Sequence, residues 1–108
     1  MTINCLGRVN VPTPGTPVPL TTDLSVRASK VLFQVIPGLT GKTYAGTTGM
    51  VKGTLAGTAR VLWPNSAGGF SETFYIETQD GENSIRLADY AVDADVAGEG
   101  LLVTYWTE

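Results

Sequence analysis

Apolar and polar residues alternate along several short segments of this chain with the two-residue period of a β-strand. The clearest segment is residues 71–78, where Phe74 and Ile76 alternate with more polar neighbours. We expect these two side chains to face a core. Tyr75, which lies between them, should then be an outward-pointing aromatic residue.

Residues 29–46 form the stretch around which the rest of the chain is expected to be organised. Two apolar and β-branched runs are separated by a break at Pro37–Gly38, which favours a turn. The second run, residues 42–46, has Tyr44 as its anchor. The pattern predicts two strands that cross the middle of an all-β domain.

The first of these central strands has apolar residues on both faces. One face carries Val31, Phe33 and Val35, and the other carries Leu32, Gln34 and Ile36. This pattern is typical of a strand covered on both sides. Gln34 is the exception, and it is either a buried amide satisfied by backbone groups or the edge of an interface.

Further alternating segments predict strands at residues 2–11, 58–63, 83–88 and 101–107, with a short one around Val92. In the first segment one face would hold Ile3, Cys5, Val9 and Val11. Cys5 is then most simply a small core side chain. The Asp80–Gly81 pair favours a tight hairpin that leads into residues 83–88, where Ile85 and Leu87 would be buried.

Four prolines between residues 11 and 20 prevent this segment from donating a full ladder of hydrogen bonds. The segment is therefore an edge strand or an extended arm, and two interpretations remain open. It could pack on its own domain, or it could lie on a neighbouring subunit or partner, where a stiff chain loses little entropy on binding. The candidate contact residues are Val11, Pro12, Pro14, Pro17 and Pro19.

The chain has 108 residues, which suits one domain, and its 13 glycines, 6 prolines and many threonines favour turns and strands over helices. We therefore predict an all-β, single-domain β-sandwich over residues 1–108, of jelly-roll type, with a small closed barrel as the alternative. Residues 1–22 would form an N-terminal strand and a Pro-rich arm, and residues 23–108 the sandwich body.

Composition argues against several classes of function. The net charge is −3, and the lysines and arginines form no basic stripe, so binding to nucleic acid or to an anionic membrane is not expected. The chain has no histidine to act as a proton carrier and no G-x-S-x-G motif, so no catalytic residues are predicted. A single cysteine, no leader pattern and no long apolar run indicate a soluble chain made in the cytoplasm.

Acidic residues cluster between positions 89 and 99. The run Asp93–Ala94–Asp95 followed by Gly98 is similar to the start of a calcium loop, but the remaining ligands and the flanking helices are missing. We interpret it as a polar turn and predict neither a metal site nor a cofactor. Whether Asp93 and Asp95 bind a cation is left open.

Exposed aromatic residues are used for sugar stacking and for protein interfaces. The candidates in this chain are Trp63, Tyr75, Tyr90 and Trp106. Most tryptophans and tyrosines are core residues, so at most one or two of these are expected in an interface. Tyr75 and Trp106 are the two that we assign to partner binding.

Three segments carry a resemblance to a known family: residues 30–34 (KVLFQ), residues 41–46 (GKTYAG), and residues 93–95 (DAD) with residues 98–106 (GEGLLVTYW). They resemble small virion proteins of tailed bacteriophages, the β-sandwich decoration or cement proteins of the capsid and related head or tail components. The resemblance extends over about two thirds of the chain through strand and turn patterns. The Pro-rich segment is not part of it.

The resemblance implies a non-enzymatic protein that binds and stabilises the assembled capsid, with the major capsid protein as its partner and no small-molecule substrate. It also implies a homo-oligomer, either a dimer or a trimer, on the outer capsid surface of the virion. Two alternatives remain: a phage tail or receptor-binding component, and a carbohydrate-binding module that stacks sugars on Tyr75 or Trp106.

Overall fold

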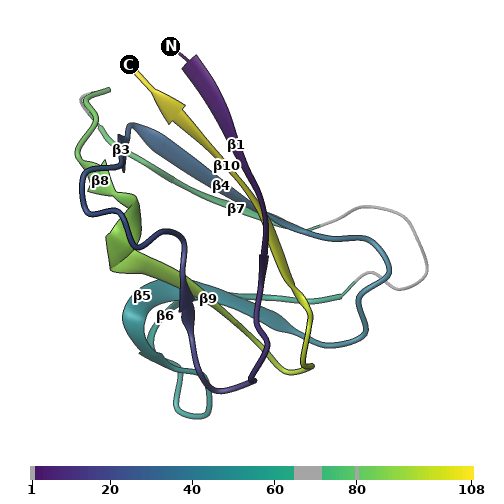
Figure 1. The fold of residues 1–108 in the computed structure, drawn as a ribbon. Coiled ribbons are helices and arrows are strands. Elements are labelled where there is room, and N and C mark those ends of the chain that lie inside the picture. The colour runs from purple at the N-terminus through teal and green to yellow at the C-terminus, as the bar shows by residue number, and fades with distance from the viewer. Residues whose placement is uncertain (1, 65–71, 80) are drawn as a thin grey trace.

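Ten short strands and one 3-10 turn make up the regular structure of residues 2–64, 72–79 and 81–108, which the computed structural model describes (Figure 1). The strands are β1 Thr2–Asn10, β2 Val18–Pro19, β3 Arg27–Ala28, β4 Lys30–Val35, β5 Thr43–Val51, β6 Ala56–Leu62, β7 Thr73–Glu77, β8 Ile85–Arg86, β9 Tyr90–Ala94 and β10 Gly100–Thr107. The 3-10 turn is Leu87–Asp89. In this part of the chain no helix reaches the length and apolarity that crossing a bilayer requires.

Two antiparallel four-stranded sheets pack face to face. The first sheet has the strand order β1-β10-β4-β7, and the second has the order β2-β9-β5-β6. A separate two-stranded ribbon joins β3 and β8. The predicted all-β sandwich is therefore confirmed.

The strands pair in a nested order. β1 pairs with β10, β2 with β9, β4 with β7, and β5 with β6. The two chain ends consequently lie side by side at one end of the first sheet, where Thr2 pairs with Thr107 (Figure 1). The predicted central strands are indeed interior strands, but β4 lies in the first sheet and β5 in the second.

The core fills the space between the two sheets. Phe33 on β4 is fully buried and stacks against Phe74 on β7 with 6.0 Å between the ring centroids. Val31 and Val35 are also buried, as the alternation predicts. The outward residues Leu32, Gln34 and Ile36 are only partly buried, so the prediction that this strand is covered on both sides is wrong. The first sheet packs against the core on one face only.

The prediction of which β1 side chains face the core is wrong for the first half of the strand. A register shift between Cys5 and Gly7 interrupts the pairing with β10, and Gly7 has a φ of 85°, which glycine adopts readily. The bulge reverses the alternation, so Cys5 and Ile3 are exposed while Leu6 packs against the core. Val9 and Val11, beyond the bulge, are buried as predicted.

The hairpin predicted between residues 71–78 and 83–88 is not formed as a strand pair. β7 pairs with β4, whereas β8 is two residues long and pairs with β3. Ile85 and Leu87 are buried as predicted, because the 3-10 turn and a hydrogen bond from the Leu87 N–H to the Val26 carbonyl (3.1 Å) direct the chain inward. Asp80 of the predicted turn lies outside the described residues.

The Pro-rich segment packs on its own domain. Val11 is fully buried, and its N–H donates to the Glu99 carbonyl at 2.8 Å. Val18–Pro19 forms a two-residue edge strand on β9. Proline is tolerated on an edge strand because it has no N–H to donate, and the free side of an edge strand needs no donor.

Candidate partner-binding face

The surface of the first sheet that points away from the core carries side chains from all four strands, and we call it the outer sheet face. Strand register places its residues in rows, since directly paired residues share a face. One row is Ile3, Trp106, Lys30 and Glu77; the next is Cys5, Thr104, Leu32 and Tyr75; a third is Arg8, Leu102, Gln34 and Thr73.

Apolar side chains gather on the outer sheet face. Ile3 is 61% exposed and Tyr75 is 57% exposed, and Leu102 is also an exposed large apolar residue. Leu32 and Trp106, in the same rows, are partly exposed. Single exposed apolar residues are ordinary, but a group of them on one face makes that face a candidate interaction surface.

Lys30 lies beside two aromatic rings of this face. Its Nζ is 4.7 Å from the centroid of the Tyr75 ring and 5.2 Å from that of the Trp106 ring. An ammonium group at this range is attracted to an aromatic ring by about 0.5–1 kcal/mol at an exposed site. The two contacts bring Tyr75, Lys30 and Trp106 together across β7, β4 and β10.

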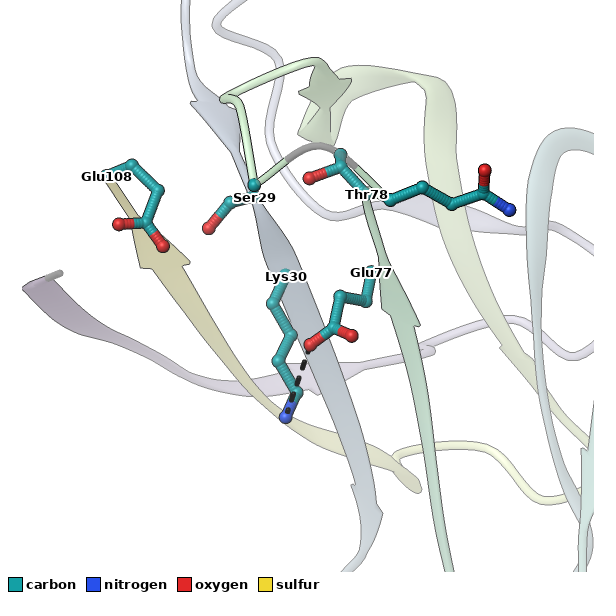
Figure 2. Close-up of a pocket in the computed structure, with 7 residues that line it drawn as sticks. Ser29, Lys30, Glu77, Thr78 and Glu108 are labelled. Atoms are coloured by element: carbon teal, nitrogen blue, oxygen red, sulfur yellow. Dashed lines mark ion pairs between the residues drawn. The ribbon is translucent and has the colours of Figure 1, made fainter.

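A shallow hollow of about 230 Å³ adjoins the outer sheet face at one end (Figure 2). Lys30 and Glu77 form part of its lining and approach each other with 4.0 Å between Nζ and Oε2 (Figure 2). The hollow is open and smaller than the ~300–1,000 Å³ of typical small-molecule sites. It therefore fits a side chain of a partner better than an enclosed small ligand.

Part of the outward surface of the second sheet is covered by the chain itself. Tyr44, Met50 and Ala91 are buried there in a small second cluster, against which Val61 packs. Tyr44 is thus a buried anchor, as the sequence predicts. The two sheets consequently differ in where apolar side chains are exposed: Ile3, Tyr75 and Leu102 are exposed on the outer face of the first sheet, whereas those exposed at the second sheet, Val51 and Trp63, lie at strand ends.

Asp93 holds the Pro-rich segment against the second sheet. The carboxylate is fully buried, and its Oδ1 accepts hydrogen bonds from the Gly15 N–H (3.0 Å) and the Ala94 N–H (2.8 Å). Its Oδ2 has no hydrogen-bond partner within the described residues. A buried carboxylate with two backbone donors is a structural connection between these segments.

Asp95 and Glu99 bind other parts of the chain. Asp95 Oδ1 accepts from the Tyr44 hydroxyl at 2.9 Å and from Lys52 Nζ at 3.0 Å. Glu99 accepts from the backbone N–H groups of Thr40 and Gly41, each at 3.0 Å. The acidic side chains therefore hold different segments, and no group of three or more potential metal ligands occurs in residues 2–64, 72–79 and 81–108.

The contact between Tyr44 and Asp95 shifts the pKa values of both side chains. Burial raises the pKa of Tyr44 to about 12, and its hydrogen bond to Asp95 adds to the shift. For Asp95, burial opposes the charged form, but the hydrogen bonds from Lys52 and Tyr44 outweigh it and lower the pKa. The phenol therefore stays protonated and keeps donating across the physiological range.

Glu99 should make a measurable contribution to acid stability. Burial opposes its charged form, but the bonds from Thr40 and Gly41 outweigh it and lower the pKa below the ordinary 4.5. A carboxyl with a depressed folded-state pKa stabilises the fold above its unfolded pKa, and this stability is lost as the pH falls through the folded value. Glu99→Gln should therefore destabilise most at neutral pH.

Urea denaturation of the wild type and Glu99→Gln between about pH 3 and about pH 7 tests this prediction. The difference in the free energy of unfolding should shrink as the pH falls below 4.5. A difference that stays constant over the whole range would contradict it.

The structure brings together only some of the residues predicted to bind a partner. Tyr75 and Trp106 lie on either side of Lys30. The Pro-rich segment follows the opposite end of β1, so it is not part of this face (Figure 1). Val11 contributes a buried side chain, Pro12 is exposed, and Pro14, Pro17 and Pro19 are half-buried. Contact of these prolines with a partner stays a prediction.

Sequence patterns did not reveal the other members of the outer sheet face. The sequence around Lys30 does not indicate that this residue contacts two aromatic rings, because the contact depends on the pairing of β4 with both β7 and β10. Ile3 was predicted to be buried, since the bulge in β1 is not visible in the alternation.

Comparison with known proteins identifies no relative: no family model matches the chain, and neither a curated protein nor a solved structure matches it.

Proposed function

We propose that this chain is a non-enzymatic structural protein of a tailed-phage virion that binds the assembled capsid through its outer sheet face. The observation that carries the proposal is the uncovered apolar surface in which Lys30 contacts both Tyr75 and Trp106. Aromatic residues are enriched at the centres of protein interfaces. The partner would be the major capsid protein, on the outer surface of the shell.

The fold supports this proposal. Nested pairing of the first strand with the last, and of the second strand with the next to last, is the order expected of a jelly roll. Jelly rolls occur in viral capsid and lectin domains. The segments that resemble phage virion proteins correspond to parts of β4, β5, β9 and β10, which are the interior strands of the two sheets.

Stabilisation of the shell would follow from mass action. A protein that binds only the assembled capsid shifts the equilibrium toward that form. A rigid sandwich suits this role because little conformational entropy is lost on binding. A homo-oligomer made in the host cytoplasm could contact several capsid subunits at once.

Co-sedimentation with expanded capsids that lack the protein tests the proposal. The wild type should pellet with the capsids and raise their thermal resistance. The double variant Tyr75→Ala, Trp106→Ala should lose binding by about 100-fold or more, since central aromatic residues contribute about 2 kcal/mol or more each. The double variant should remain folded because these rings are not fully buried.

Trp63→Ala is the matched control. Trp63 is 59% exposed, much like Tyr75, but it follows β6 in the second sheet and is not on the outer sheet face. Its removal should leave binding unchanged. Absence of wild-type binding, or equal binding by the double variant, would overturn the proposal.

A carbohydrate-binding function is the second candidate, because an exposed Tyr75 ring on the outer sheet face can stack against a sugar. Binding to a glycan array that is lost in Tyr75→Ala would favour this function over shell binding. A tail or receptor-binding role belongs to the same virion class. A neighbouring major capsid gene in the phage genome would favour decoration over both alternatives.

A further inference from the structure

The two sheets end in four edge strands, β1 and β7 in the first sheet and β2 and β6 in the second. An edge strand presents unpaired N–H and C=O groups that can pair with another strand. Natural proteins protect such edges with short strands, prolines, bulges or charged residues. The four edges of this sandwich are not equally protected.

Three edges carry clear protective features. β2 has only two residues, one of which is Pro19. β6 carries Arg60, and two register shifts interrupt its pairing with β5. β7 has five residues and ends in the charged Glu77. These features disfavour pairing with a further strand at each of the three edges.

β1 is less protected along its first half, because its bulge and its one charged residue lie beyond that half. It is nine residues long and contains neither proline nor an acidic residue. Its bulge between Cys5 and Gly7 separates two halves, and the only charged residue, Arg8, lies in the second half and bonds the Asn10 side chain. The first half, residues 2–5, is uncharged, and its Ile3 side chain is 61% exposed.

We propose that two copies of this chain form a dimer by antiparallel pairing of the first halves of their β1 strands about a two-fold axis. The occupant is a second copy because a strand paired antiparallel to itself satisfies its own free N–H and C=O groups. The uncharged segment also brings no like charges together at the axis. Ile3 of each copy would then lie against the other copy instead of water.

The pairing joins two four-stranded sheets into one eight-stranded sheet. The outer sheet faces of the two copies then point to the same side and become continuous through Ile3, which pairs with Trp106 within each copy. This inference selects a two-fold dimer over a trimer. It does not depend on capsid binding, because the dimer forms in solution without a shell.

Sedimentation velocity of the purified protein tests the inference. The wild type should sediment as a dimer, and Ile3→Lys should weaken the dimer at least about tenfold, because the axis brings two like charges together. Leu24→Lys is the matched control: Leu24 is 63% exposed, lies outside the strands, and should leave the dimer unchanged. Circular dichroism should show that both variants are folded.

Cross-linking gives an independent readout, since Cys5 is the only cysteine in the chain and is exposed on β1. A short bis-maleimide should link wild-type protein into covalent dimers at low concentration, and Ile3→Lys should prevent the link. A wild-type monomer, a trimer, or a dimer unaffected by Ile3→Lys would overturn the inference. A dimer that fails to bind capsids would instead overturn only the proposed function.

Discussion

Replacing Gly100 with alanine should destabilise the protein by roughly 3 kcal/mol or more, because the new methyl group would collide with the neighbouring strand. Gly100 pairs with Asn10 where β10 begins. A Cβ at this position would overlap the Val9 carbonyl oxygen and lie 2.8 Å from the Asn10 Cα. These are backbone atoms of β1, so they cannot rotate away as a side chain would.

Urea denaturation measures the effect, with Gly49→Ala as the matched control. Gly49 is also a strand glycine, in β5, but a Cβ there would meet no atom within 4 Å. Gly49→Ala should change the free energy of unfolding by no more than about 1 kcal/mol, since alanine costs less conformational entropy than glycine. Equal midpoints for the two variants would show that β1 does not pass this close to Gly100.

Phe33→Ala should cost about 3–5 kcal/mol of folding stability. The Phe33 ring is fully buried on β4 between the two sheets, and its removal would leave a cavity beside Phe74. Gln34→Ala, at the next position on the same strand, should cost about 0.5 kcal/mol or less because that side chain points outward. Similar losses for the two variants in urea denaturation would contradict the inward orientation of Phe33.

Local alternation was sufficient to predict which side chains of most strands face the core. Val31, Phe33 and Val35 on β4 are buried, and Tyr75 on β7 points outward. In a sandwich with one buried face per sheet, a side chain's orientation follows directly from its position in the alternation. No knowledge of strand partners is needed for this step.

The alternation of apolar and polar residues gave wrong predictions where pairing between strands distant in the sequence determines side-chain burial or the choice of strand partner. In β1, the bulge that exposes Cys5 forms against β10, almost a full chain length away. The Asp–Gly pair before residues 83–88 gave a local hairpin signal, yet β7 pairs with β4 and β8 pairs with β3. Tertiary pairing outweighed local turn preference at this site.

The candidate site was only partly predictable for the same reason. Tyr75 and Trp106 could be selected individually as outward aromatic residues, but they lie 31 positions apart in the sequence. Their convergence on Lys30 requires β4 to lie between β7 and β10, and this order is set by the packing of the whole sandwich. The acidic residues of the predicted polar turn proved to bind several separate segments.

A cryo-electron microscopy map of capsids decorated with the wild-type protein tests the central claim most directly. The proposal predicts that the outer sheet face lies against the shell, with Tyr75 and Trp106 in contact with the major capsid protein. A map in which this face points to solvent, with the Pro-rich segment or the second sheet making the contact, would contradict it.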